Sequence, residues 1–213
     1  MERSTSDAVV TVQGLHFGWP GIPLFHHLNL VLPAGVSVVC GEESSGKTTL
    51  LRLLSGDLSA HHGSIVLRGA TPNAPDQPLS TQVFRTEPRS DAFDAISALA
   101  WWASLPARYP RFNARLAREL AHGFALEPHI EKPLYMLSAG SKRKVWLCAA
   151  FAAGTSLTLI DEPFAALDKA SIRFLHGLLE EASSHPDRAW VLADHTPPEG
   201  LVLKKQLVLP APD

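Results

Sequence analysis

Short apolar runs that stop abruptly at glycine or acidic residues recur along this chain. Residues 36–40, 157–160 and 189–193 are the clearest of these runs. A strand that is buried on both faces shows such a continuous apolar run, whereas a half-exposed strand alternates. We therefore expect these three segments to be strands of one buried sheet, with a further strand over residues 206–209.

Helical patterns occupy much of the sequence between the predicted strands. Residues 50–54 and 145–151 are apolar stretches that each follow a loop containing glycine and serine, and we expect a helix over each. Residues 94–107 and 113–124 predict two more helices, which are separated by a proline-containing turn. Helices that alternate with buried strands are typical of an α/β fold.

Length and composition allow one α/β domain with a small helical subdomain. With 213 residues, of which 46% are hydrophobic, the chain can bury a full core but has no room for a second large domain. We assign residues of about 1–87 and 138–213 to the core, and residues of about 88–137 to the helical subdomain.

Charge and hydropathy exclude several classes of protein. The formal net charge of −2 argues against a general nucleic-acid binder, which would be basic. Residues 1–7 are polar and lack the apolar stretch of a signal peptide. No apolar run approaches the roughly 20 residues that cross a bilayer. We therefore expect a soluble chain.

The cysteines and paired histidines indicate no metal site. Cys40 and Cys148 lie in apolar segments, so we expect buried free thiols in a reducing cytosol. Histidines are adjacent at 26–27 and again at 61–62. Because adjacent side chains point to different sides of an extended chain, we interpret both pairs as structural or solvated.

A phosphate-binding loop follows the first predicted strand. Residues 41–48 fit the pattern G-x-x-x-x-G-K-[ST] at every fixed position. The glycines let backbone N–H groups surround a polyphosphate, Lys47 supplies a cation, and Thr48 offers a hydroxyl to Mg²⁺. The positive end of a helix that starts near Thr49 points at the anion. The nucleotide-binding residues predicted here are Gly41, Glu42, Glu43, Ser44, Ser45, Gly46, Lys47, Thr48 and Thr49.

Two carboxylates and a histidine follow the other two apolar runs. Asp161 and Glu162 come at the end of one predicted strand and His195 comes just after another, and ligands of open α/β sheets bind at such carboxyl ends. Asp161 is a candidate ligand of Mg²⁺, and Glu162 a candidate base for the water that attacks a γ-phosphate. His195 can hydrogen-bond that phosphate. Alone, the two acids would equally suit a helix cap, but the phosphate loop favours catalysis.

A second phosphate-binding loop is predicted around Ser138 and Gly140, before the helical stretch at 145–151. A hydroxyl and backbone donors at a helix N-terminus can bind phosphate. The alternative is an ordinary serine N-cap. Residues 142–144 are three cations in the first helical turn, which oppose the helix dipole and so indicate a nearby anion.

Five motifs in order resemble those of the ATP-binding subunits of ABC transporters. Residues 41–48 resemble the Walker A loop, 137–141 the signature loop, 157–162 the Walker B strand and 166–168 the D-loop, and His195 resembles the switch histidine. The resemblance implies a P-loop cassette with a mixed β-sheet core, an N-terminal antiparallel β region and a helical subdomain. It also implies Trp19 as a platform for adenine, with Phe17 in the core, and adds Asp168 to the nucleotide-binding residues.

The resemblance further implies an ATPase that uses ATP and Mg²⁺. Two copies, or this chain and a related ATPase, would enclose two nucleotides, each between Lys47 of one subunit and Ser138 of the other. Closure would drive a separate transmembrane permease, with the ATPase peripheral on the cytoplasmic face of the plasma membrane. The short single cassette is similar to export-type ATPases, so we expect an exporter. A regulatory ATPase that moves a protein partner without transport is the alternative.

Two departures from the family pattern carry expectations of their own. Ala139 and Ser141 replace the commoner glycine and glutamine of the signature loop. The family has a glutamine directly after the strand that we expect over 81–84, and this chain has none there. Gln82 comes three residues too early and is expected to belong to the strand, and Glu87 is a possible substitute as an oxygen ligand. We therefore expect turnover that is slow or depends on a partner.

Aromatic residues are concentrated in the predicted helical subdomain. The simplest interpretation is packed core, and one or two exposed members would instead form a groove for a membrane partner. An exposed tryptophan among them would then be needed for partner binding. These residues are Phe93, Trp101, Trp102, Tyr109 and Phe112.

Overall fold

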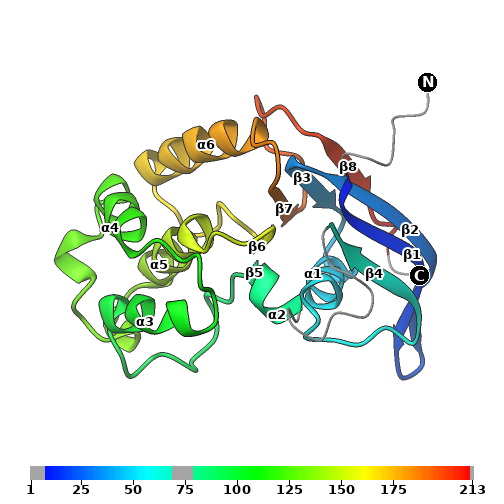
Figure 1. The fold of residues 1–213 in the computed structure, drawn as a ribbon, viewed down its shortest axis with the longest axis horizontal. Coiled ribbons are helices and arrows are strands. Elements are labelled where there is room, and N and C mark those ends of the chain that lie inside the picture. The colour runs from blue at the N-terminus through cyan, green and yellow to red at the C-terminus, as the bar shows by residue number, and fades with distance from the viewer. Residues whose placement is uncertain (1–7, 69–78, 212–213) are drawn as a thin grey trace.

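The structure, a computed structural model, describes residues 8–68 and 79–211, and its strands form two sheets (Figure 1). The larger sheet has the strand order β5-β6-β7-β3-β8, and each of its strand pairs is parallel. Its strands are β3 (Gly35–Cys40), β5 (Val83–Arg85), β6 (Leu157–Asp161), β7 (Ala189–Asp194) and β8 (Lys205–Val208). All four strands predicted from apolar runs are therefore confirmed.

The smaller sheet is antiparallel and is built from the N-terminal part of the chain. Its order is β2-β1-β4, with strands β1 (Ala8–Trp19), β2 (Ile22–Pro33) and β4 (His62–Leu67). The expected antiparallel β region is thus confirmed. The expected mixed core differs in one respect, because the parallel and antiparallel pairs lie in two separate sheets among the described residues.

Each central strand of the parallel sheet is buried on both faces. In β7, Val191 packs in the layer formed by the antiparallel sheet and α1 (Lys47–Ser55), whereas Leu192 packs with α5 (Ala139–Ala152) and α6 (Lys169–Ser183). Leu159 and Ile160 of β6 divide in the same way. Successive side chains of a strand alternate between faces, so an unbroken apolar run supplies both layers of core.

The helical subdomain contains α3 (Ala98–Ser104) and α4 (Ala114–Gly123), which lie beside α5 (Figure 1). The helix predicted over 94–107 begins later, because Ser97 caps α3 by accepting a hydrogen bond from the Ala100 N–H at 3.2 Å. The segment ends in a short 3₁₀ turn over Leu105–Ala107. Asn113 caps α4 in the same manner as Ser97 caps α3, which confirms the second predicted helix to within one residue.

The tryptophans of the subdomain are core residues. Trp101 and Trp102 are 1% and 2% exposed, and the Trp101 ring lies 4.4 Å from that of Trp146 on α5. Tyr109 is buried too, and Phe93 is only partly exposed. The interpretation that these aromatic residues are packed core is therefore confirmed, and an exposed tryptophan for partner binding is not found here.

Two further expectations concern burial and membrane spans. Both cysteines are buried and free, as expected. No helix within residues 8–68 and 79–211 is long and apolar enough to cross a membrane. The expectation about residues 1–7 lies outside the described part of the chain.

Candidate functional site

The phosphate loop joins β3 to α1 and folds around a lysine. Ser44 and Gly46 have left-handed backbone angles, with φ of 62° and 96°. The Lys47 ammonium donates hydrogen bonds to the carbonyls of Gly41 and Glu42, each at 2.7 Å. The helix α1 begins at Lys47, two residues before the predicted start. The loop therefore places one cation and a helix N-terminus at the carboxyl edge of the parallel sheet.

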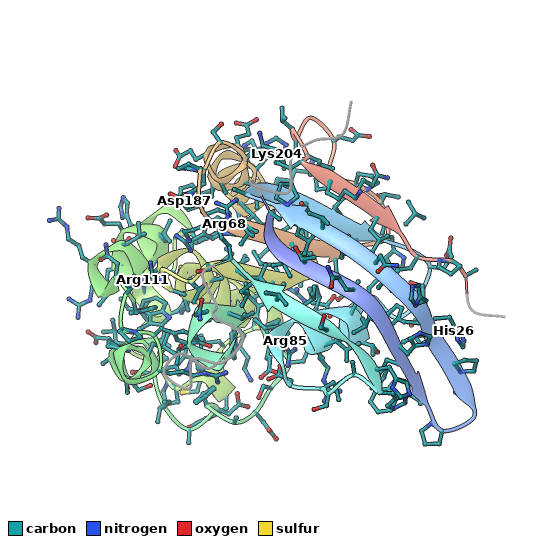
Figure 2. All side chains as sticks on the ribbon, turned by 45° about the vertical axis from the view of Figure 1, so that its right-hand side comes forward. His26, Arg68, Arg85, Arg111, Asp187 and Lys204 are labelled. Atoms are coloured by element: carbon teal, nitrogen blue, oxygen red, sulfur yellow. The ribbon has the colours of Figure 1, made fainter. Side chains whose placement is uncertain are left out.

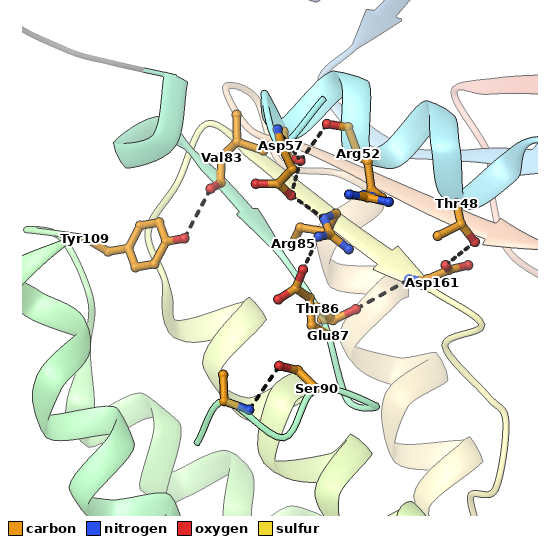
Figure 3. A network of polar contacts seen from close by, with 12 residues as sticks. Thr48, Arg52, Asp57, Val83, Arg85, Thr86, Glu87, Ser90, Tyr109 and Asp161 are labelled. Carbon is orange, nitrogen blue, oxygen red and sulfur yellow. Dashed lines mark hydrogen bonds and ion pairs between the residues drawn. The ribbon is translucent and has the colours of Figure 1, made fainter. Parts of the chain in front are cut away.

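A hydrogen bond joins this loop to the tip of β6. The Thr48 hydroxyl donates to the Asp161 carboxylate at 2.6 Å, and the Asp161 N–H donates to the Thr86 hydroxyl at 3.4 Å (Figure 3). Burial raises the pKa of Asp161, the Thr48 hydroxyl opposes this shift, and the charge of Glu162 adds to it. The two predicted magnesium ligands are thus brought together.

Glu162, the predicted base, is held in a left-handed conformation with φ of 47°. Its N–H donates to the carbonyl of Ala193 on β7 at 2.9 Å. Its carboxylate accepts a hydrogen bond from Arg89 at 2.7 Å and lies 3.9 Å from the guanidinium of Arg143. A polar side chain in this strained region indicates a position fixed by its surroundings.

Arg143 of α5 fixes the backbone beside that carboxylate. Its side chain is only 9% exposed, and its Nη1 donates to the carbonyls of Asp161 and Glu162. Burial lowers the pKa of Arg143, while the negative charge of Glu162 opposes the shift. The helix that follows the second predicted phosphate loop therefore holds the tip of β6.

These side chains share one cavity of about 380 Å³. The lining includes Thr48, Asp161 and Glu162 together with residues 85–90 at and after the end of β5. His195, Ser138 and Gly140 are not among the lining residues. The lining residues are Thr48, Arg52, Arg85, Thr86, Glu87, Pro88, Arg89, Ser90, Arg143, Asp161 and Glu162.

The second predicted phosphate loop has a clear local role. Ser138 caps α5, because its hydroxyl accepts a hydrogen bond from the Ser141 N–H at 3.1 Å. A side chain on Gly140 would place its Cβ 2.3 Å from the carbonyl oxygen of Ala166, so only glycine fits this close approach. Binding of phosphate by Ser138 and Gly140 stays a prediction.

The three cations after this loop have partners within the chain. Lys142 pairs with Asp94 at 2.6 Å, and Lys144 pairs with Asp168 at 2.7 Å. Arg143 donates to the backbone carbonyls at the tip of β6. Carboxylates and backbone carbonyls of this chain are therefore the partners of these three cations, so the cations do not support a bound phosphate.

Asp168 is a helix cap. Its carboxylate accepts hydrogen bonds from the Ser171 N–H and hydroxyl, both at 2.9 Å, at the start of α6. The hydrogen bond from Lys144 holds the pKa of Asp168 well below its usual range. These contacts explain the residue without a nucleotide, and its predicted contact with one stays a prediction.

The outer parts of the predicted site lie around the cavity. Trp19, at the end of β1, is 42% exposed, whereas Phe17 is 7% exposed and lies in the core as expected. His195 is exposed and follows β7, whose Ala193 carbonyl binds the Glu162 N–H. Trp19 as an adenine platform and His195 as a phosphate sensor both stay predictions.

The segment that replaces the expected glutamine loop is rich in arginine. Gln82 is the last residue of the short helix α2 (Leu79–Gln82), so its assignment to the strand is wrong. Arg85 donates to Asp57 at 2.8 Å and also pairs closely with Glu87 (Figure 3). The Glu87 carboxylate, considered as a substitute ligand, is thus bound by a guanidinium.

Sequence reasoning missed the contributions of Thr86, Arg89 and Arg143. Arg143 was visible only as one of three adjacent cations, and nothing in the sequence tells which of them points inward. A useful signal is an arginine directly after an apolar strand, because the carboxyl end of such a strand is where a ligand binds.

Histidines also gather in a way that the sequence did not indicate. His16 on β1 lies 5.7 to 6.3 Å, between ring centroids, from His26, His27 and His62. Figure 2 shows His26 on the antiparallel sheet, far from Arg85 in the cavity wall. No group of three or more potential metal ligands converges within residues 8–68 and 79–211, so the expectation of no metal site here is not contradicted.

Comparisons with known proteins agree with this geometry. The family model described as ABC transporter matches residues 25–165. The taurine import ATP-binding protein TauB of Pseudomonas entomophila is 31% identical, with 97% of this chain and 80% of the relative covered. The nickel import ATP-binding protein NikO of Rhodobacter capsulatus is also 31% identical, covering 86% of this chain and 78% of the relative. Neither name supports the expectation of an exporter.

Solved structures show the same fold. The ATP-binding subunit of an ABC transporter superimposes with a TM-score of 0.78 at 21% identity, over 88% of this chain and 79% of that one. A putative ABC transporter ATP-binding protein from Pyrococcus furiosus has a TM-score of 0.75 at 19% identity, over 94% and 96%. By its sequence and its fold, this chain belongs to the ABC transporter family as an ATP-binding subunit, one of the ATPases that drive transport.

Proposed function

We propose that two Mg-ATP molecules are bound between two subunits, either two copies of this chain or this chain and a related ATPase, and that their hydrolysis drives a separate transmembrane permease. The observation that carries the proposal is the contact between Thr48 of the phosphate loop and Asp161 at the tip of β6. Glu162, the next residue, lines the same cavity. These contacts support a site in which the phosphate loop, a metal-binding pair and a base act on one γ-phosphate.

The chemistry of these donors suits Mg²⁺. Thr48 supplies a hydroxyl and Asp161 a carboxylate, and both are hard oxygen ligands. Mg²⁺ keeps several waters and takes substrate phosphates as further ligands, so two protein ligands suffice. When bound, the ion neutralises charge on the β- and γ-phosphates. Lys47, which now donates to two carbonyls of its own loop, supplies a second positive charge.

Glu162 is the residue that we assign to proton abstraction. Its carboxylate lines the cavity beside Asp161, and its backbone is fixed by β7 and by Arg143. A fixed carboxylate can accept a proton from a water in line with the γ-phosphate. His195 lies after the neighbouring strand at the same sheet edge, where it suits a contact with that phosphate.

The opposite side of each nucleotide is assigned to the partner subunit. Ser138 and Gly140 lie at the N-terminus of α5 and are absent from the lining of this chain's own cavity. We assign them to a phosphate held by another copy, because a helix N-terminus supplies backbone donors that suit an anion. Asp168 lies at the start of α6 and is exposed enough to reach such an interface, and Trp19 is exposed enough to stack on adenine.

The relatives guide the direction of transport. Both are named as import proteins, so uptake is favoured over the export expected from the chain's size. The permease would hold this subunit at the cytoplasmic face of the plasma membrane, where ATP is supplied.

The catalytic assignment is tested with Glu162→Gln. We expect hydrolysis to slow by roughly 10²- to 10⁴-fold, because one proton acceptor is removed, while ATP affinity is retained. The measurement is phosphate release together with equilibrium binding of ATP. If the variant hydrolyses ATP at the original rate, Glu162 is not the base.

The same variant tests the partner. Tagged Glu162→Gln protein is purified from detergent-solubilised membranes with and without ATP, and its partners are identified by mass spectrometry. A stoichiometric polytopic membrane protein supports the transporter. Recovery of soluble partners alone, or of the homodimer alone, supports the regulatory ATPase.

A further inference from the structure

Two arginines, one at the end of β5 and one after it, line the proposed nucleotide cavity and differ in exposure. Arg85 is 12% exposed in its side chain and is bound by both Asp57 and Glu87. Arg89 is 82% exposed in its side chain and pairs with Glu162 at 2.7 Å. Arg85 is therefore held by two carboxylates, whereas Arg89 is a largely exposed cation that lines the same cavity.

The other arginines of the cavity are less able to move toward a ligand. Arg143 is 9% exposed in its side chain and donates to two backbone carbonyls. Arg52 lies on α1 and is partly buried. Of these four guanidinium groups, that of Arg89 has the greatest freedom to reorient without breaking a buried contact.

We propose that Arg89 binds the γ-phosphate of ATP. When ATP enters the cavity, the Arg89 guanidinium moves from the Glu162 carboxylate to the terminal phosphate. The proposal rests on the proposed nucleotide site, because it takes the phosphate loop to hold ATP beside Thr48. Arg89 and Thr48 line one cavity, and the Arg89–Glu162 contact is at 2.7 Å. Transfer of the guanidinium to phosphate frees the carboxylate that is assigned to proton abstraction.

The relative strengths of the two contacts favour this exchange. Exposed ion pairs shift an equilibrium by no more than about fivefold. Hydrogen bonds to a charged group contribute roughly tenfold to a hundredfold, and guanidinium groups match phosphate oxygens in a bidentate manner. The terminal phosphate of ATP carries more charge than one carboxylate, so it competes successfully for Arg89. ADP lacks the γ-phosphate and leaves Arg89 on Glu162.

The test compares affinities for two nucleotides. The β,γ-imido analogue of ATP and ADP itself are titrated, in the presence of Mg²⁺, into the wild-type chain and Arg89→Ala by calorimetry. We expect the affinity of Arg89→Ala for the ATP analogue to be roughly tenfold weaker, with ADP affinity within about twofold of the wild type. Arg89→Lys keeps the charge but not the bidentate geometry, so its affinity for the ATP analogue is expected to lie between those of the wild type and Arg89→Ala.

Arg115→Ala is the matched control. Arg115 is 89% exposed in its side chain and pairs with Glu119 at 2.8 Å on α4, outside the cavity. Its removal also breaks an ion pair of an exposed arginine, but one away from the cavity, so both affinities are expected to stay at wild-type values. A loss in the Arg115→Ala variant equal to that in Arg89→Ala overturns the proposal.

A second pair of variants tests the competition itself. If Glu162 competes with phosphate for Arg89, Glu162→Gln tightens binding of the ATP analogue more when Arg89 is present than in Arg89→Ala. An equal or larger gain without Arg89 overturns the proposal. So does an unchanged ratio of ATP-analogue to ADP affinity in Arg89→Ala.

Failure of the nucleotide site gives a different result. If the wild-type chain binds neither nucleotide, the proposed function fails together with the inference. If the wild type binds both and Arg89→Ala binds both equally well, only the inference fails. In that case a faster turnover of Arg89→Ala shows that Arg89 merely restrains Glu162.

Discussion

Arg85→Gln places a glutamine at the last position of β5, and it removes a double ion pair. The Arg85 side chain is 12% exposed, while its partners Asp57 and Glu87 are 36% and 41% exposed. Fully exposed pairs contribute about 0.2–1 kcal/mol, and hydrogen bonds to charged groups contribute about 1.5–3 kcal/mol. This half-buried double pair lies between those limits, so we expect a loss of about 1–3 kcal/mol in the free energy of unfolding.

A loss of this size is measurable by thermal unfolding. For a chain of this length, each kcal/mol lowers Tm by roughly 2–4 °C, which predicts a fall of about 2–12 °C. Arg115→Gln breaks an exposed i,i+4 pair on α4 worth about 0.3–0.5 kcal/mol, and we expect a fall below about 2 °C. If the Tm of Arg85→Gln lies within about 1 °C of the wild-type Tm, the ion pairs do not stabilise the fold.

The pH dependence of this loss has a definite sign. The pKa of Asp57 is lowered in the folded chain, because hydrogen bonds from Ser55 and Arg85 outweigh the effect of burial. A lowered carboxyl pKa contributes stability that is present above the unfolded value of 3.8 and is lost as the pH falls through the folded value. The difference in stability between the wild type and Arg85→Gln should therefore shrink below about pH 4, as measured by urea unfolding. A difference that is constant from pH 7 to pH 3 would argue against the pairing with Asp57.

Gly140→Ala and Asp161→Asn test contacts near the site, and Gly177→Ala provides a comparison for the first. Gly140→Ala puts a Cβ 2.3 Å from the Ala166 carbonyl, so we expect unfolding to be easier by roughly 1–3 kcal/mol in urea titrations. Gly177→Ala, where a Cβ meets nothing within 4 Å, should instead stabilise α6 by about 0.5–1 kcal/mol. Asp161→Asn should raise Tm at neutral pH, because burial raises the pKa of Asp161 and its ionised form therefore opposes folding. That gain should disappear in acid, where the wild-type carboxyl is protonated, and a lower Tm at neutral pH would refute the argument.

The sequence predicted the parallel strands and the phosphate loop because their signals are local. An apolar run bounded by glycine or acids specifies a buried strand, and the fixed loop pattern allows few other structures. The contact between Thr48 and Asp161 follows from those two motifs together, since both lie at one sheet edge. The N-caps at Asn113 and Ser138 have the side chains that the sequence rules favour.

The remaining features depend on contacts between distant segments. Lys142, Arg143 and Lys144 are adjacent cations, yet only Arg143 reaches the tip of β6, while its neighbours pair with Asp94 and Asp168. Their directions are set by the packing of α5 against the sheet, which no local pattern reports. The histidines around His16 come from different strands and meet only through strand register.

The segment after β5 connects two cavities of the molecule. Arg85 and Glu87 line the cavity that also contains Thr48 and Asp161, and they line a second cavity of about 290 Å³, whose wall includes Trp101 and Trp146. Both tryptophans are buried, so the second cavity is bounded by this ion pair and by the aromatic core. Arg89 comes two residues after Glu87, so the residues shared by both cavities directly adjoin the arginine that pairs with Glu162.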